Sequence, residues 1–155
     1  MSVDTSACPS SDKRVVLFGL LLETNARLSK SLGVQLEAAC GLPLAWFEVL
    51  LQLRRSPDGR LKMTQIADAI VHSTGGTTRL IDRLEEAQYV ERSSCPSDRR
   101  AIHVGITAQG NAKLDEALNV HLDYLDENLV ARLNCDERDT LTALLEKLNT
   151  ASTPS

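Results

Sequence analysis

The spacing of apolar residues predicts two long helices, one on each side of a region of shorter elements. Apolar residues recur every three or four positions from residue 13 to about residue 39, and Asp12 stands where it can cap the first turn. The same spacing predicts a helix from about Ala108 to Leu133, with Thr107 as its cap. Its leucines form one stripe and are Leu114, Leu118, Leu122, Leu125, Leu129 and Leu133. A turn at 134–137 precedes a last amphipathic helix, whose apolar residues are Leu141, Leu144, Leu145 and Leu148.

The region between the long helices contains three shorter helical patterns. The first covers residues 44–55 and ends at the turn sequence SPDG. A short helix follows with Thr64 as its N-cap, and its pattern breaks near His72. Ser73 can then cap another helix over residues 74–87. Two short helices joined by a tight turn form the helix-turn-helix pattern.

Two runs of strand character follow these helices. They cover residues 89–93 and 101–107, and the turn sequence CPSDRR (95–100) joins them. Apolar and polar residues alternate in the second run, as the two-residue period of a strand requires. We therefore expect a mainly α-helical fold with a small wing of two or three antiparallel strands, that is, a winged helix-turn-helix joined to long helices.

The length of the outer helices predicts a dimer. At about 1.5 Å per residue the first and fifth helices would each be roughly 40 Å long, and a compact winged unit cannot cover apolar stripes of that length. Pairing with a second copy is the simplest solution, whereas a monomeric helical extension would leave the 114–133 stripe little to pack against. The expected parts are a disordered N-terminus (1–11), a single folded unit (12–149) and a frayed tail (150–155). Within that unit, dimerisation helices (12–40 and 108–149) flank the winged helix-turn-helix (44–107).

Charge is spread unevenly over these parts. The chain carries a net charge of -4, but residues 1–59 hold six basic and six acidic side chains and are neutral. Residues 60–107 hold seven basic and six acidic side chains, while residues 108–155 hold four basic and nine acidic ones. The predicted winged region is thus the only part with a positive balance. A net acidic chain still binds a polyanion if its basic groups share one face.

The helix at 74–87 has the character of a helix that reads DNA. Leu80 and Leu84 share an apolar face, and small or donating side chains lie in the N-terminal half, which a recognition helix places in the major groove. We expect Asp82 to hold Arg79 in position as an i,i+3 partner. Gly75 and Gly76 indicate either close approach of the backbone to a phosphate or simply a loose first turn. The candidate DNA contacts on this helix are Thr74, Gly75, Thr77, Thr78, Arg79 and Arg83.

The run TRLIDRLEEAQYVERSSCPSDRRAIHVGITAQG resembles the MarR family of winged helix-turn-helix transcriptional regulators. The resemblance covers about residues 13–149, with Gln88 where the family usually has Gly and Ile106 where it has Leu. It implies a homodimer on a pseudo-palindromic operator in double-stranded DNA. It also implies that Arg100 enters the minor groove, that Asp98 orients it and that Arg99 contacts a phosphate; a narrow minor groove attracts a guanidinium. The alternative is an Asp-Arg pair that only stabilises the hairpin tip.

The resemblance also implies control by a small, often phenolic or aromatic, molecule that releases the DNA, which would make the protein a repressor. Trp46, Phe47 and His121 are candidates for lining such a ligand pocket, although each is also an ordinary core or interface residue. Some relatives sense oxidants through a cysteine, for which Cys95 and Cys8 are the candidates. The alternative is that both thiols stay reduced and silent.

Other classes of function lack support in the sequence. No nucleophile–base pair, phosphate loop or metal-ligand cluster is visible, so we expect no enzyme, no metal and no cofactor. The first eleven residues do not have the pattern of a secretion signal, and no apolar segment approaches the roughly 18 residues of a membrane span, so we expect a cytoplasmic protein. Two alternatives stay open: a helical dimer that acts through a protein partner without DNA, and a regulator that senses redox state through a cysteine.

Overall fold

The computed structural model describes residues 9–70, 76–95 and 97–150. Helices form most of it, and three short strands follow or separate them. In chain order the elements are η1 (Pro9–Ser11), α1 (Lys13–Cys40), α2 (Leu44–Arg55), β1 (Arg60–Lys62), α3 (Met63–Ala69), α4 (Thr77–Glu86), β2 (Val90–Cys95), β3 (Asp98–Ile106), α5 (Ala108–Leu125), η2 (Asp126–Val130) and α6 (Cys135–Thr150).

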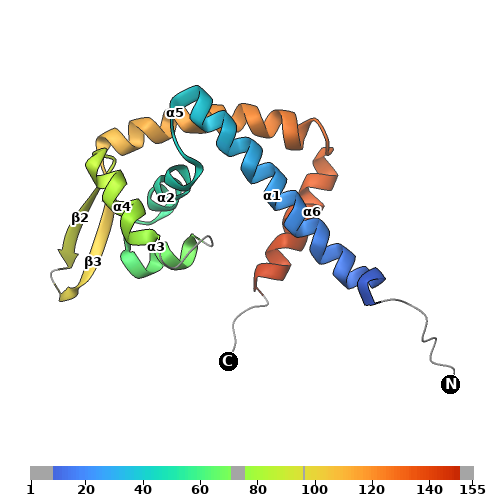
Figure 1. Cartoon of the computed structure of the whole chain (residues 1–155), viewed down its shortest axis with the longest axis horizontal. Helices are drawn as coiled ribbons and strands as arrows, with labels where there is room; N and C mark the ends of the chain where they lie inside the picture. Colours follow the sequence, from blue (N-terminus) through green and yellow to red (C-terminus); the bar gives the residue numbers. More distant parts are fainter. Residues whose placement is uncertain (1–8, 71–75, 96, 151–155) are drawn as a thin grey trace, which may run out of the picture.

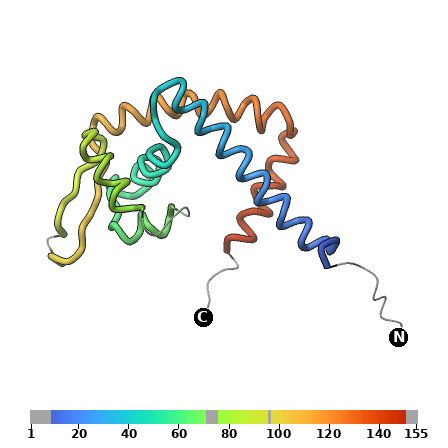
Figure 2. The backbone as a smooth tube through the Cα atoms, in the orientation of Figure 1, coloured from blue at the N-terminus to red at the C-terminus, as the bar shows by residue number. Residues whose placement is uncertain are grey.

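The helix α5 joins two separate parts of the molecule (Figure 1). At one end lies the winged unit, which we define as α2, β1, α3, α4, β2 and β3. At the other end lies the arm, defined as residues 13–28 of α1 together with η2 and α6. The backbone trace shows α1 descending from the middle of the molecule into the arm, where α6 also lies (Figure 2). The arm and the winged unit therefore extend from opposite ends of α5.

The wing is a three-stranded antiparallel sheet in the order β1-β3-β2. Val104 of β3 pairs with Leu61 of β1 on one side, and Ile106 pairs with Val90 of β2. The predicted fold class, with a wing of two or three antiparallel strands, is confirmed. The strand runs predicted from sequence lacked β1, because three residues are too few to produce a recognisable two-residue period.

Two of the predicted helix caps are confirmed. Asp12 Oδ1 accepts a hydrogen bond from the Arg14 amide at 2.8 Å, and Thr107 Oγ1 accepts one from the Gly110 amide at 3.0 Å. The Thr64 cap was wrong, because α3 begins at Met63 and already includes Thr64. Pairing of β1 with β3 keeps the backbone extended as far as Lys62, which therefore becomes the N-cap residue.

The fourth helix is shorter than predicted. Gly76 is its N-cap residue and Thr77 its first helical residue, so the predicted capping by Ser73 was wrong. Ser73, Thr74 and Gly75 lie outside the described residues. A glycine opposes helix formation through its backbone freedom, which accounts for a helix that begins after Gly76.

The fifth helix also departs from a single continuous α-helix. The α-helical part ends at Leu125, and the chain continues through the π-helical turn η2 and a bend to α6. The helical path therefore covers most of the predicted span of 108–133, but its last part is wider than an α-helix.

The core belongs to the winged unit and to the helices packed on it. Buried apolar side chains come from the second half of α1, from α2, α3 and α4, from the sheet and from α5. The largest of those with almost no exposed area are Leu36, Leu42, Val49, Leu50, Leu53, Ile66, Ile81, Leu84, Val90, Val104 and Leu114. No residue of α6 is buried. The winged unit is thus well packed in one chain, whereas the arm leaves its apolar residues exposed.

The root of α5 packs closely on the wing at Gly110. A Cβ atom at this position would collide with the Tyr89 carbonyl oxygen and would lie 2.9 Å from Ile106 Cγ1. The Thr107 hydroxyl donates to the Gln88 carbonyl at 2.6 Å in the same region. Gln88 itself has φ 65°, a backbone conformation that glycine adopts more readily than other residues.

Candidate nucleic-acid interface

The helix α4 buries one face and exposes its basic residues. Ile81 and Leu84 are fully buried. Thr78, Arg79 and Arg83 are exposed on the outer side. Three of the predicted contacts on α4 are thus free to meet a ligand.

Thr77 does not share that position. Only 8% of this residue is exposed, so its side chain offers little surface to a ligand, and its role as a DNA contact stays a prediction. The two remaining candidates, Thr74 and Gly75, lie outside the described residues.

Arg92 on β2, which sequence reasoning missed, binds the outer carboxylates of α4. Its backbone amide donates to Glu85 Oε2 at 2.9 Å, and its guanidinium donates to Glu85 Oε1 at 3.3 Å and pairs with Asp82. A weaker bond of 3.4 Å reaches the Thr78 carbonyl. The prediction that Asp82 pairs with Arg79 was therefore wrong, because Arg92 is aimed at both carboxylates from the adjacent strand. We call this group, Arg92 with Asp82 and Glu85, the helix–wing network.

The network has two consequences for binding a polyanion. It ties α4 to β2, so the helix and the wing keep one relative position. It also sets the positive charge of Arg92 against two carboxylates that would otherwise repel phosphates. Charge-assisted hydrogen bonds of this kind are the stronger ones in proteins.

The tip of the wing carries the other predicted contacts. Asp98, Arg99 and Arg100 are all exposed at the start of β3. Asp98 Oδ1 accepts a hydrogen bond from the backbone amide of Arg100 at 3.0 Å. Asp98 therefore orders the backbone at the tip, whereas we expected it to orient the guanidinium. Neither Arg99 nor Arg100 forms an ion pair with a residue that the structure describes.

A lysine from β1 adds to the basic character beside the tip. Lys62 lines a shallow crevice of about 290 Å³ together with Asp98 and Arg100. The wall of this crevice continues through Met63, Thr64, Ala101 and Ile102. The missed strand β1 therefore brings an unexpected cation to the wing, close to the predicted minor-groove arginine.

The predicted ligand-pocket residues form packing contacts. The Trp46 ring meets Tyr89 edge-on with ring centroids 6.1 Å apart, and buried Phe47 lies 5.2 Å from the His121 ring. His121 Nδ1 is buried without a hydrogen-bond partner among the described residues. Burial, with a smaller effect from the charge of Arg55, lowers the pKa of His121 below its ordinary value of 6.5.

A separate hollow of about 310 Å³ lies between α2 and α4. Arg79 and Arg83 line it, and the rest of its wall is formed by Ala45, Ile70, Gly76, Thr77 and Leu80. Trp46, Phe47 and His121 are not part of this wall. The hollow thus combines apolar surface with two of the exposed arginines of α4.

Cys95 lies at the end of β2, close to the wing tip. Its sulfur is 3.1 Å from the Ser97 hydroxyl, and hydrogen bonding with Ser97 lowers the pKa of the Cys95 thiol below its ordinary value. Cys8, the second redox candidate, lies outside the described residues. Within the described residues, no group of three or more His, Cys, Asp or Glu side chains could hold a metal ion.

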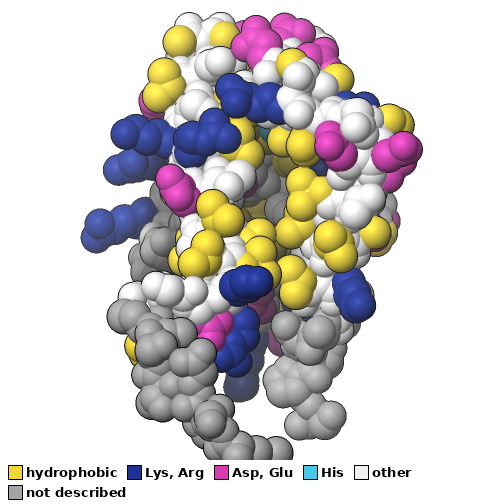
Figure 3. Space-filling view, turned by 90° about the vertical axis from the view of Figure 1, so that its right-hand side faces the viewer, with side chains coloured by type: hydrophobic (Ala, Val, Ile, Leu, Met, Phe, Trp, Pro, Cys, Tyr) yellow, Lys and Arg dark blue, Asp and Glu magenta, His cyan; other side chains and the backbone are white. Residues whose placement is uncertain are grey.

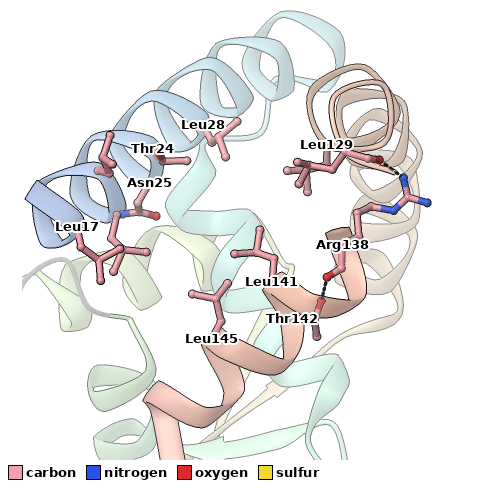
Figure 4. Close-up of a pocket in the computed structure, with 12 residues that line it drawn as sticks. Leu17, Thr24, Asn25, Leu28, Leu129, Arg138, Leu141, Thr142 and Leu145 are labelled. Carbon is pink, nitrogen blue, oxygen red and sulfur yellow. Dashed lines mark hydrogen bonds between the residues drawn. The ribbon is translucent and has the colours of Figure 1, made fainter. Parts of the chain in front are cut away.

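The arm contains a groove of about 670 Å³ between α1 and α6. Figure 3 shows yellow hydrophobic side chains on both sides of a depression in this face. In the close-up, Leu17 and Leu28 of α1 face Leu141 and Leu145 of α6 (Figure 4). The remaining lining residues are Leu20, Leu21, Thr24, Asn25, Leu129, Leu133, Arg138 and Thr142.

Across the described residues, 9–70, 76–95 and 97–150, no single helix is long and apolar enough to cross a membrane. Only α1 and α2 taken together, bent by 89° at their junction, meet that length and composition.

Known proteins share both the sequence pattern and the fold. A family model for the MarR family matches residues 41–101. The transcriptional repressor MprA of Escherichia coli K12 is 26% identical over 136 residues, which cover 88% of this chain and 76% of that protein. The HTH-type transcriptional regulator MhqR of Bacillus subtilis is 31% identical over 108 residues, which cover 70% of this chain and 72% of that protein.

Two solved structures in complex with DNA resemble the present one. One is the MarR family regulator Sco3205 of Streptomyces coelicolor, with a TM-score of 0.79 and 26% identity over 90% of this chain and 88% of that chain. The other is a mutant MarR of Escherichia coli with operator DNA, with a TM-score of 0.76 and 26% identity over 92% of this chain and 99% of that chain.

The fold is that of a winged helix-turn-helix protein, and the similarity to these regulators places the chain in the DNA-binding class. The chain belongs to the MarR family and is a transcriptional regulator.

Proposed function

We propose that the protein is a homodimeric repressor that binds a pseudo-palindromic operator in double-stranded DNA. The observation that carries this proposal is the division of charge on the DNA-reading elements. Arg92 engages the carboxylates of α4, while Arg79, Arg83 and Arg100 stay exposed without ion pairs among the described residues. Such unpaired guanidinium groups suit contacts with phosphates and base edges.

The contacts divide between the two grooves. The N-terminal half of α4, with Thr78 and Arg79, enters the major groove, and Arg83 contacts the flanking backbone. The wing tip directs Arg100 into the adjacent minor groove, while Arg99 contacts a phosphate. Lys62 adds a further phosphate contact beside the tip.

Dimer formation explains the exposed apolar surface of the arm. Leu17, Phe18 and Leu148 are about 60% exposed in the single chain (59%, 62% and 58%), although each is strongly apolar. Exposed apolar patches of this extent mark interaction sites. A second copy fills the groove between α1 and α6 with the same leucine-rich helices, and the pair then presents two copies of α4.

The repressor role is supported by similarity to MprA, a transcriptional repressor. Release by a small phenolic or aromatic molecule is supported by the hollow between α2 and α4. An aromatic anion suits this hollow because its apolar wall accepts the ring and Arg79 and Arg83 attract the charge. Bound there, the anion would compete with DNA for the same guanidinium groups.

Selection from a pool of random duplexes tests the DNA-binding function. We expect the full-length protein to enrich a pseudo-palindrome with half-sites about one helical turn apart. Placed upstream of a reporter gene, the enriched sequence should lower expression when the protein is present, and small phenols or benzoates should reverse the effect. Absence of any enriched sequence would reject operator binding and favour the alternative of a helical dimer that acts through a protein partner.

A further inference from the structure

One side chain, Arg54, joins the last turn of α2 to the first turns of α5. Its Nε donates to Asn111 Oδ1 at 3.0 Å and its Nη2 donates to the Asn111 carbonyl at 2.7 Å. Its Nη1 forms an ion pair with Asp115, one turn further along α5. We call this set of contacts the Arg54 clamp.

The chemistry of the clamp makes it sensitive to angle. A guanidinium is planar and rigid, and here each of its three nitrogens has a separate acceptor. Two acceptors belong to Asn111 and the third lies one turn away, so the contacts define the direction of α5 as well as its distance from α2. Only 30% of the Arg54 side chain is exposed, which limits its alternative positions.

The position of the clamp gives that angle a long-range effect. The helix α2 belongs to the winged unit, while α5 leads to the arm. From Asp115 to Val130 the helical path covers about 22 Å at 1.5 Å per residue. A tilt of about 5° at the clamp would therefore shift the far end by about 2 Å, which is more than half of the 3.4 Å rise of a base pair.

Neighbouring contacts between α2, α5 and the wing do not define the angle between α2 and α5 in the same way. Close packing at Gly110 limits distance, and the Phe47–His121 ring contact is apolar and permits a range of orientations. Arg55, the next residue of α2, forms no part of the clamp. The directional contacts between α2 and α5 are thus concentrated in Arg54.

We propose that Arg54 is a specificity-determining positioning residue, which sets the spacing between operator half-sites that the protein accepts. The proposal rests on the proposed function, because half-site spacing matters only for a dimer that places two copies of α4 on one duplex. The clamp fixes each winged unit on its α5 helix, and the two α5 helices carry the units at a set separation. Loosening the clamp widens the range of separations without changing the residues that touch DNA.

A spacing series tests this role. The probes are the duplex that the wild-type protein selects, derivatives with one or two base pairs inserted or removed at its centre, and a duplex with a single half-site. The variants are Arg54→Lys, which keeps the charge but not the fork of donors, and Asp115→Ala, which removes one acceptor from an exposed position. Arg55→Met is the matched control on the same turn.

In the wild-type protein and in Arg55→Met we expect a strong preference for the selected spacing. Arg54→Lys should lower the affinity ratio between the selected and the shifted spacings by about threefold or more, and Asp115→Ala should lower it less. Affinity for the single half-site should stay within about twofold of wild type, because α4 and the wing are unchanged. A threefold change corresponds to about 0.7 kcal/mol and a twofold change to about 0.4 kcal/mol.

Two outcomes would overturn the inference. An unchanged spacing ratio in Arg54→Lys, or an equal loss of affinity on every duplex including the single half-site, would show that Arg54 serves stability alone. If the wild-type protein selects no duplex, the proposed function fails and the spacing role fails with it. Failure of the spacing role and failure of the proposed function are distinguishable, because only failure of the proposed function appears in the wild-type protein.

Discussion

Two arginines on neighbouring strands of the wing have opposite surroundings. Arg92 on β2 contacts two carboxylates and a carbonyl, whereas Arg100 on β3 stands exposed at the tip, with only its backbone amide bound to Asp98. The same residue type thus supports two roles, because a guanidinium with its donors engaged holds structure and one with free donors can bind a new acceptor.

At the scale of this residue, Arg100→Ala should weaken operator binding and lower its dependence on salt. Loss of a cation that contacts phosphate or the minor groove should lower the salt slope by about one unit. Fluorescence anisotropy titrations at several salt concentrations provide the measurement, with Arg132→Ala, an exposed arginine in the turn between η2 and α6, as control. Equal affinity and slope in Arg100→Ala and wild type would reject the minor-groove role.

His121 should make stability depend on pH. Burial lowers the pKa of His121 in the folded protein below its ordinary value of 6.5, so the unfolded chain takes up the proton at a higher pH than the folded chain. Stability is then complete above about pH 7 and is lost as pH falls through 6.5 towards the lowered pKa. Thermal melts at pH 7.5 and 5.5 should show a smaller decrease in Tm for His121→Gln than for wild type. The same decrease in both proteins would argue against His121 as the origin of the pH dependence of stability.

At the scale of elements, the helix–wing network decides how α4 stands relative to the sheet. Arg92→Met removes every guanidinium bond of the network but keeps a long side chain. We expect a loss of operator affinity of about tenfold or more, because α4 loses its tie to β2 and two carboxylates lose their counter-charge.

A triple variant separates these two causes. Adding Asp82→Asn and Glu85→Gln to Arg92→Met removes the negative charges without restoring the tie. Recovery of most of the affinity would indicate that Arg92 acts through charge, whereas a persistent loss would indicate positioning. Wild-type affinity in Arg92→Met itself would contradict both roles.

Close packing between α5 and the wing predicts that a larger side chain at Gly110 destabilises the fold. Gly110→Ala would place a Cβ against the Tyr89 carbonyl, and such overpacking costs about 1–3 kcal/mol of the free energy of unfolding. The control is Gly33→Ala in the interior of α1. The added Cβ would lie 3.5 Å from Leu44 Cβ of α2, which is an ordinary van der Waals contact. Urea unfolding should show a lower midpoint for Gly110→Ala only, and equal midpoints for the two variants would contradict the close contact.

At the scale of the whole molecule, one chain contains a packed winged unit and an unpacked arm. Tyr124 ties α1 to α5 through a hydrogen bond to the Leu28 carbonyl at 2.9 Å, so the root of the arm is ordered. Beyond that point α6 has no buried residue, and its leucines are exposed. Six of the nine acidic side chains of residues 108–155 lie between residues 126 and 146, in this part of the molecule. A symmetric pair would bury the arms and leave both wings free.

Leu145→Glu should therefore prevent pairing. Leu145 lines the groove and is 40% exposed in the single chain, so a carboxylate there would be buried at the proposed interface without a partner. Sedimentation equilibrium at micromolar concentration should show a dimer for wild type and for the conservative control Leu145→Met, and a monomer for Leu145→Glu. A stable wild-type monomer would reject the dimer outright.

Local patterns in the sequence determined most of the helices, the wing and several site residues. The three-to-four-residue spacing and the oxygens of Asp12 and Thr107 act within one or two turns, so they could be read directly from the chain. Likewise the turn residues between β2 and β3 were sufficient to predict that Arg99 and Arg100 lie at an exposed tip.

Tertiary structure decided the pairings between distant residues. It added β1, whose three residues form a strand only because β3 lies beside them, and it gave Asp82 to Arg92 although Arg79 is closer in sequence. It also brought Arg54 to Asn111 across 57 positions. The physical reason is the same in each case: a long side chain or an extended backbone bonds whichever acceptor the fold brings within about 3 Å, and sequence spacing does not encode that proximity.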